Sequence, residues 1–165
     1  MHPAALPVDE LLKHTREVHA RRSGPGGQHR NKTQTAVVIL HKPTGISAEA
    51  SERRSQAENR RVALTRLRMK LAVEHRTPTN PSGSSDLWRS RARGGKLVIS
   101  ASHEDFPALV AEALDHLQEA RWQVSPTAET LGVTTSQLMG LFKKAPIAWA
   151  AVNKHRLAVG LPALK

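Results

Sequence analysis

The first hydrophobic pattern along the chain predicts a β-hairpin. Residues 35–41 include four consecutive branched apolar residues, a short unbroken run that is typical of a buried strand. Residues 42–45 place proline and glycine where a type I turn favours them, and residues 46–50 return as the second arm. Ahead of this hairpin, we expect a short helix over residues 9–14 and a strand over residues 17–22.

A second pattern, with apolar residues three and four positions apart, predicts a helix that begins at Ser55 and stops before residue 78. Ser55 and Glu58 have the spacing of a capping box, and Leu64, Leu67 and Leu71 form an apolar stripe. Each basic residue on the remaining surface fits either a solvated face or a polyanion-binding face, and we expect the solvated interpretation for about half of them. These residues are Arg53, Arg54, Arg60, Arg61, Arg66, Arg68 and Lys70.

Helical spacing also characterises the last part of the chain, residues 106–165. Asp105 can cap a helix that has Pro107 in its first turn and an apolar face after it. A second helix is expected to start at Ser125 and end at Gly132, and Thr134 can cap a third. The spacing across the last two helices resembles a helix-turn-helix core, and an ordinary helical hairpin explains it equally well.

Between these patterns, residues 77–105 are expected to form a basic loop or linker, with a short strand from Leu97 to Ser100. Trp88 lies close to Arg91 and Arg93, a combination able to stack on a base and hold phosphates. Burial of the tryptophan in the core explains the same residues equally well.

Together, the patterns predict an α+β fold. We expect a small mixed sheet with a packed basic helix and a glycine-rich loop, followed by a small all-α C-terminal domain that resembles a helix-turn-helix. The expected segments are residues 1–76, 77–105 and 106–165.

The composition narrows the partners. A formal net charge of +11 favours a polyanion, and nucleic acid over a membrane, because no apolar run approaches the roughly 18 residues of a spanning helix. The absence of cysteine excludes disulfides, thiolate catalysis and cysteine-ligated zinc. The nine histidines lack metal-binding spacing, so we expect no metal. Residues 1–7 do not resemble a signal peptide, so a cytoplasmic protein is expected.

Residues 23–28 are the most unusual segment, because three of the six are glycine and basic residues lie on both sides. Such a cluster can be a plain surface loop. Glycine also lets another surface approach the main chain closely, so a functional tip is the alternative. The segment lacks the Gly-Lys-Ser/Thr ending of a phosphate-binding P-loop.

The longer string Ser23-Gly24-Pro25-Gly26-Gly27-Gln28-His29-Arg30-Asn31-Lys32-Thr33 resembles the catalytic loop of class I peptide chain release factors and related ribosome-rescue hydrolases. Pro43-Thr44-Gly45-Ile46 and Arg54-Ser55-Gln56 resemble two further motifs of that family, in the same order. Arg30 stands where the family usually has a small apolar residue, and Pro25 where alanine is more common.

The resemblance implies hydrolysis of the ester between a nascent peptide and tRNA, in the peptidyl-transferase centre of the large ribosomal subunit. In the family, the backbone N–H of the glutamine stabilises the reacting centre, and the side chain helps to shape the water site. These roles fall to Gln28, while Gly26 and Gly27 permit the backbone conformation. Ribosomal RNA and the tRNA 2′-hydroxyl provide the rest, so no cofactor is expected.

The expected partners are large-subunit ribosomal RNA and peptidyl-tRNA, bound by a monomer. The candidate RNA-binding residues are Arg21, Arg22, Ser23, His29, Arg30, Asn31, Lys32, Arg54, Ser55, Gln56, Arg60, Arg61, Trp88, Arg91 and Arg93.

About twenty residues precede the loop, and nothing resembles the family's tripeptide codon-reading motifs. The resemblance is therefore closer to the short rescue hydrolases, which act without a codon. Those proteins carry a basic tail that enters the empty mRNA channel, whereas residues 106–165 are nearly neutral and helical in pattern. Two alternatives are a DNA-binding module in residues 106–165, against which their sparse basic charge argues, and a factor that docks on ribosomes without hydrolysis.

Overall fold

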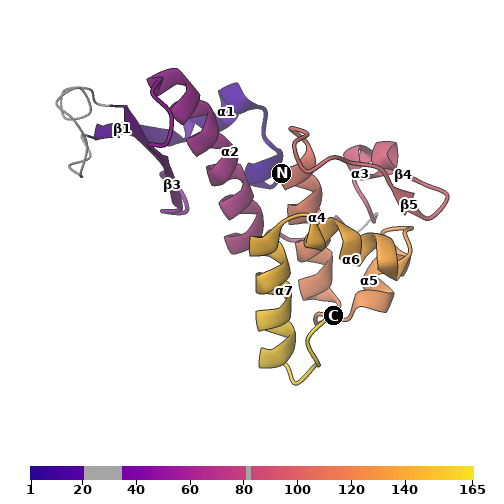
Figure 1. Ribbon diagram of the computed structural model, residues 1–165. Coiled ribbons are helices and arrows are strands. Elements are labelled where there is room, and N and C mark those ends of the chain that lie inside the picture. The colour runs from indigo at the N-terminus through magenta and orange to yellow at the C-terminus, as the bar shows by residue number, and fades with distance from the viewer. Residues whose placement is uncertain (21–34, 81–82) are drawn as a thin grey trace.

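A computed structural model of the chain describes residues 1–20, 35–80 and 83–165. An antiparallel sheet forms much of the N-terminal part, and the C-terminal part is mostly helical (Figure 1). This arrangement confirms the predicted α+β fold with a helical C-terminal segment. The elements before residue 77 are η1 (Pro3–Ala5), α1 (Val8–Lys13), β1 (Thr15–Ala20), β2 (Ala36–His41), β3 (Ser47–Ala50) and α2 (Gln56–Glu74). The elements after it are α3 (Asp86–Arg91), β4 (Ala92–Arg93), β5 (Lys96–Leu97), α4 (Phe106–Glu119), α5 (Val124–Thr130), α6 (Thr135–Lys143) and α7 (Pro146–Ala158).

The sheet has the strand order β1-β2-β3, and both pairings are antiparallel, so the expected mixed sheet is wrong for the described strands. The predicted hairpin is confirmed, because β2 pairs with β3 and Ile39 lies opposite Ala48. Val37 and Ile39 are fully buried on the face that α2 covers. The strand ahead of the hairpin is also present, although it begins at Thr15, two residues before the expected start.

Helix α2 begins and packs as the sequence predicts. The Ser55 hydroxyl accepts a hydrogen bond from Glu58 N at 3.4 Å, which satisfies an amide of the first turn. Leu64, Leu67 and Leu71 are buried, with β2 and β3 on one side and α4 on the other. Helix α2 therefore connects the sheet to the C-terminal helices through a continuous apolar core.

Helix α4 is the central helix of the C-terminal part, and nearly every residue from Phe106 to Leu117 is buried. A helix buried around its whole circumference needs neighbours on all sides, and η1, α2, α5 and α6 supply them. The predicted cap is wrong: Asp105 occupies the N-cap position, but its side chain makes no capping hydrogen bond. Its Oδ2 accepts a hydrogen bond from Arg91 Nη2 at 2.7 Å instead.

The segment expected to be a linker contains regular structure. The Ser85 hydroxyl caps α3 by accepting a hydrogen bond from Trp88 N at 3.0 Å. Strands β4 and β5 form a small hairpin, in which Gly94 and Gly95 make the turn with φ angles of +57° and +75°. The expected strand from Leu97 to Ser100 is therefore misplaced, because β5 is Lys96–Leu97.

Helices α5 and α6 pack against each other across a turn at Gly132, where φ is +66°. Thr134 caps α6 as predicted. Helix α5 begins at Val124, one residue before the expected Ser125, and has no side-chain cap. The buried residues that fit the helix-turn-helix pattern are Ala128, Leu131, Val133 and Leu138.

A polar network fixes the end of α2 to α4. The Asp115 carboxylate accepts hydrogen bonds from Arg76 Nη1 (2.8 Å), Thr77 N (3.2 Å) and Thr77 Oγ1 (2.6 Å). Burial lowers the pKa of the Arg76 guanidinium, and the charge of Asp115 opposes that shift. Because this network joins the sheet-bearing part to the helical part, the two have a defined orientation. The division into residues 1–76, 77–105 and 106–165 stays a prediction.

Candidate active site

The candidate catalytic residues lie between β1 and β2, outside the described residues. This holds for Gly26, Gly27 and Gln28. It also holds for seven predicted RNA-binding residues, namely Arg21, Arg22, Ser23, His29, Arg30, Asn31 and Lys32. The structure does describe the base of this segment, meaning the strands and the helix that hold its two ends.

Strands β1 and β2 bring the two ends of the segment together at one end of their ladder. The ladder extends from the pair Thr15 and His41 to the pair Ala20 and Ala36. Paired strands lie about 4.8 Å apart, so the segment leaves and re-enters the sheet at neighbouring points. This end of the ladder lies at the end of the molecule remote from the C-terminal helices (Figure 1).

Asn59 of α2 fixes the point where the chain re-enters the sheet. Its side chain is fully buried. The Nδ2 group donates to Thr35 O at 2.7 Å and to Arg53 O at 2.9 Å, and Oδ1 accepts from Arg53 N at 2.9 Å. One amide therefore holds three backbone groups, and the residue that precedes β2 cannot move independently of α2.

The start of α2 is also tied to β1. Gln56 Nε2 lies 2.7 Å from His19 Nδ1, and Arg60 Nε donates to Glu17 Oε2 at 2.8 Å. Glu17 and His19 are two positions apart on β1, so they share one face of the sheet. They lie opposite Ile39 and Val37, which face α2, so this is the face that α2 covers. Two predicted RNA-binding residues, Gln56 and Arg60, therefore contact the chain's own strand in this structure.

Other predicted RNA-binding residues at the start of α2 face solvent. Arg54 and Arg61 are exposed, and their side chains make no hydrogen bond or ion pair with the part of the chain that the structure describes. Ser55 is also exposed, with its hydroxyl engaged in the helix cap. Arg54 and Arg61 are thus among the described cations near the loop base that are open to an external anion.

A further ion pair holds the segment between β3 and α2. Arg66 Nη2 pairs with the Glu52 carboxylate, and Arg66 Nη1 donates to Glu49 O at 2.8 Å. The Arg66 guanidinium is the main reason why the pKa of Glu52 falls to about 2. Glu52 is therefore ionised at neutral pH, and the chain ahead of the helix is fastened to the helix itself.

The Pro43-Thr44-Gly45-Ile46 motif lies at the opposite end of β2 from the loop base. Gly45 has a φ of +71°, and its N–H donates to His41 O at 2.9 Å. In the expected four-residue turn over residues 42–45 the acceptor would be Lys42 O, one residue later in the chain. His41 Nδ1 lies 2.8 Å from Thr44 Oγ1, and burial lowers the pKa of the imidazole. This motif closes the hairpin, and it does not approach the loop base.

Trp88 does not have the exposure that base stacking requires. It is fully buried, and its Nε1 donates to Leu131 O at 2.8 Å. The alternative, a tryptophan in the core, is therefore correct for this residue, because α3 turns the ring inward. Arg91 is paired with Asp105, whereas Arg93 is exposed on β4. These residues lie across the molecule from the loop base, so the predicted RNA-binding residues form two separate groups (Figure 1).

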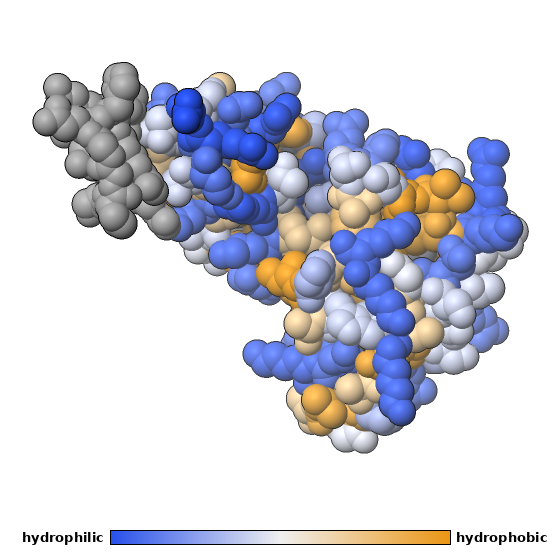
Figure 2. Space-filling model, viewed as in Figure 1, coloured by the Kyte–Doolittle hydropathy of each residue, from blue (hydrophilic) through white to orange (hydrophobic). Residues whose placement is uncertain are grey.

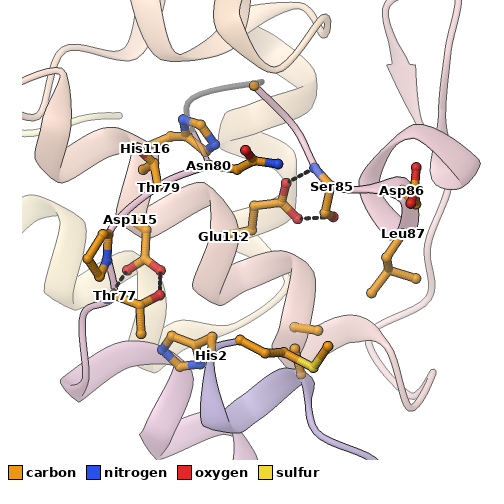
Figure 3. A pocket seen from close by; sticks show the side chains of 15 residues that line it. His2, Thr77, Thr79, Asn80, Ser85, Asp86, Leu87, Glu112, Asp115 and His116 are labelled. Atoms are coloured by element: carbon orange, nitrogen blue, oxygen red, sulfur yellow. Dashed lines mark hydrogen bonds between the residues drawn. The ribbon is translucent and has the colours of Figure 1, made fainter.

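A cavity of about 600 Å³ opens between the N-terminal residues, the segment after α2 and one side of α4 (Figure 3). Its carboxylates already have donors from the chain. Asp115 accepts from Thr77, and Glu112 accepts from Ser85 N and Ser85 Oγ at 2.6 Å each. These bonds attach the segment to α4, so the acidic groups of the cavity serve the fold.

No group of three His, Asp or Glu side chains within the described ranges lies close enough to hold a metal ion. Over the same ranges, none of the helices combines the length and the apolarity needed to cross a membrane.

Asn59, His19 and Glu17 are residues of the loop base that no motif in the sequence marks. A signal for Asn59 exists, because the residue lies four positions before Ala63 on the buried stripe of α2. A polar residue on such a stripe must find hydrogen-bond partners. His19 and Glu17 carry no comparable signal, because their role follows from pairing with a helix far along the chain.

Comparisons with known proteins agree with this arrangement. The family model described as the RF-1 domain matches residues 11–98. Peptide chain release factor 1 of Malacoplasma penetrans is 46% identical over 87 residues, which are 53% of this chain and 24% of the relative. Peptide chain release factor 1-like, mitochondrial, of Mus musculus is 51% identical over 55 residues, which are 33% of this chain and 15% of the relative. Peptide chain release factor 2 of Lactiplantibacillus plantarum is 57% identical over 51 residues, which are 31% of this chain and 14% of the relative.

These matches span a quarter or less of the relatives. The family-model match includes the paired strands, the capped helix α2 and the segment between β1 and β2. The family model covers more than half of this chain. The chain therefore belongs to the RF-1 domain family, the class I peptide chain release factors.

Proposed function

We propose that this protein hydrolyses peptidyl-tRNA on the ribosome without reading a codon. The observation that carries the proposal is the Gly26-Gly27-Gln28 tripeptide within the RF-1 domain match. The segment that holds the tripeptide starts and finishes at the same end of the β1–β2 ladder. The ladder and the Asn59 hydrogen bonds give such a tip a fixed base. The similar proteins are named peptide chain release factors.

The proposed reaction adds water across an ester. The water oxygen attacks the carbonyl carbon, the bond to the tRNA ribose oxygen breaks, and a proton passes to that oxygen. The products are a peptide with a free carboxyl group and a deacylated tRNA. Negative charge develops on the carbonyl oxygen, where a fixed N–H donor is most stabilising. We assign this donor to the Gln28 backbone and the water site to its side chain, while Gly26 and Gly27 allow the backbone conformation.

The proposed partners are large-subunit ribosomal RNA and peptidyl-tRNA, which also complete the reacting site. Arg54 and Arg61 support this assignment, because they are exposed near the loop base and have no partner within the described ranges. Arginine is well suited to phosphate because its planar guanidinium can donate two parallel hydrogen bonds. We expect the protein to act as a monomer in the cytoplasm and without a cofactor.

The codon-independent part of the proposal rests on the sequence. None of the 165 residues form a segment that resembles the family's tripeptide codon-reading motifs. The residues after the RF-1 match form helices around α4. We therefore propose that the ribosome is recognised through its RNA and peptidyl-tRNA.

The test is a release assay on purified stalled ribosomes that carry labelled peptidyl-tRNA, with and without a stop codon in the decoding site. The wild-type protein is expected to release peptide in both cases. Gly27→Ala is expected to lose nearly all release, because a Cβ restricts the backbone of the tip. Gln28→Ala is expected to lose only part, because the backbone N–H remains. Gly140→Ala is the matched control, since a Cβ at this helical glycine meets no atom within 4 Å.

The outcomes separate the hypotheses. Full release by Gly27→Ala would overturn the proposed tip chemistry. Release only with a stop codon would keep the hydrolase and remove codon independence. Ribosome binding by the wild-type protein without release would support the non-catalytic docking factor.

A further inference from the structure

A second basic surface lies at the opposite end of the molecule from the loop base. Its centre is the β4–β5 hairpin, where Arg93 lies directly opposite Lys96. Both side chains are exposed, whereas Leu97, the next residue along β5, is buried on the other face. Alternation along the strand therefore directs Arg93 and Lys96 into solvent, and like charges in this position repel each other. Figure 2 shows long hydrophilic side chains at this end of the molecule.

The position of this hairpin is fixed by contacts with α6. Thr134 N donates to Gly95 O at 3.0 Å, and Leu97 N donates to Gln137 Oε1 at 3.1 Å. Further along, Lys144 Nζ donates to Ile99 O at 2.7 Å. Residues 95–99 thus follow α6 from its first turn to its last, and Lys96 and Lys144 lie near opposite ends of that edge. The edge is about 13 Å long, since α6 has nine residues.

The two segments that build this surface contain no acidic residue. Residues 87–103 and residues 130–165 include no Asp or Glu. Of the acids just outside the first segment, Asp86 pairs with Arg89 and Asp105 pairs with Arg91, whereas Glu104 is exposed and forms no ion pair with a described residue. Arg93 and Lys96 form no ion pair within the described part of the chain. The positive charge of the hairpin is therefore not neutralised by the protein.

We propose that Arg93, Lys96 and Lys144 form a phosphate-binding ridge that contacts the backbone of ribosomal RNA. Cations along an edge of this length can reach more than one phosphate, and contacts to phosphates fix position without reading sequence. The choice of RNA rather than another polyanion rests on the proposed function.

The ridge gives the C-terminal part a role in that function. Arg54 and Arg61 lie near the loop base, and the ridge lies at the far end of the same rigidly packed chain. Two contacts on one body raise the occupancy of each, because the second contact forms at a high effective concentration. The ridge would therefore anchor the protein while the loop end reaches the reacting ester.

The experiment compares Arg93→Ala/Lys96→Ala with Lys154→Ala/Lys165→Ala in the full chain. The control pair has the same charge change and uses exposed lysines of the C-terminal part away from the hairpin. The probes are a labelled RNA hairpin, a DNA duplex of the same sequence and purified ribosomes. The hairpin variant should bind RNA and ribosomes on the order of tenfold more weakly at 0.1 M salt, and the slope of log affinity against log salt should fall by about 2. The control should bind like the wild type.

The proposal is overturned if the hairpin variant binds RNA normally, if the control loses as much affinity, or if only DNA binding is lost. Release by the hairpin variant should recover at high protein concentration, whereas Gly27→Ala should bind RNA normally and not recover release. Failure of the ridge therefore appears in binding, and failure of the proposed hydrolysis appears in release by the wild-type protein. Thermal melting shows that each variant is folded.

Discussion

The two basic ends of this protein treat their charges differently. At the loop base, Arg60 pairs with Glu17 and Arg66 with Glu52, so cations of α2 hold the chain's own acidic residues. At the β4–β5 end, Arg93 and Lys96 form no ion pair with an acidic residue in the described part of the chain. Internal pairing fixes the geometry of a site, whereas uncompensated charge attracts any phosphate backbone. The difference indicates that internal ion pairs add fixed geometry at the loop end, beside the open Arg54 and Arg61, whereas the hairpin end supplies attraction alone.

The ends also differ in how their aromatic and polar side chains are used. Near the hairpin, a tryptophan that could have served as a stacking platform fills the core. At the loop base, a buried asparagine holds backbone groups. Four predictions test this comparison, from the largest expected effect to the smallest.

Trp88→Ala should destabilise the fold by about 3–5 kcal/mol, the usual cost of truncating a large buried side chain. The ring is fully buried, and the variant also leaves Leu131 O without its indole donor. Trp149 is only partly buried and lies beneath the Lys143 ammonium, so Trp149→Ala is the matched control and should cost about 1 kcal/mol. Denaturant unfolding measures both. Equal losses would contradict the structural role of Trp88.

Asp115→Ala should cost about 3 kcal/mol, because it leaves a largely buried guanidinium on Arg76 and the donors of Thr77 without their acceptor. This network joins the two parts of the chain. Asp86→Ala removes the partner of Arg89 from an exposed pair, so it should cost below about 1 kcal/mol. Chemical denaturation monitored by both tryptophan fluorescence and far-UV circular dichroism gives the free energies of unfolding. A small loss for Asp115→Ala would show that the network does not join the two parts.

Asn59→Ala should cost about 2 kcal/mol, because three backbone groups lose the fully buried amide that pairs with them. Peptide release should fall further than stability alone explains, since Thr35 is no longer held beside α2. Asn153→Ala is the control on α7 in the C-terminal part, where the amide bonds Leu164 N and O. It should cost about 1 kcal/mol and leave release unchanged. Normal release by folded Asn59→Ala would contradict the positioning role.

The elements that sequence predicts well are those whose signals are local. The apolar run of β2, the stripe of α2 and the caps at Ser55 and Thr134 each depend on neighbouring residues. The cap predicted at Asp105 fails because Arg91, fourteen positions earlier, competes for the carboxylate. Trp88 is ambiguous in sequence for the same reason: its indole N–H finds its acceptor at Leu131, 43 positions later.

The candidate site divides in the same way. Its tripeptide and its two companion motifs are contiguous strings, so they are recognisable in the sequence. The contacts of Asn59 with Thr35 and of Arg60 with Glu17 join residues 24 and 43 positions apart. Such contacts become visible only when the helix is placed on the sheet.

The smallest expected effect concerns pH and His2, which attaches the N-terminal residues to the end of α2. Burial lowers the pKa of His2, whose Nε2 lies 3.0 Å from His75 O while Nδ1 accepts from Ala4 N. Because the folded pKa lies below the unfolded value of about 6.5, the stabilising contribution is present above pH 6.5 and is lost as pH falls below it. The main reason is that burial disfavours the charged imidazolium, and a proton on Nδ1 would also oppose the Ala4 N–H. Between pH 6.5 and 5.5, His2→Gln should lose less stability than the wild type, by at most about 1.4 kcal/mol, in denaturant unfolding at each pH. The control is the same substitution at an exposed histidine, His14→Gln. An identical pH slope for the wild type and His2→Gln would contradict this account.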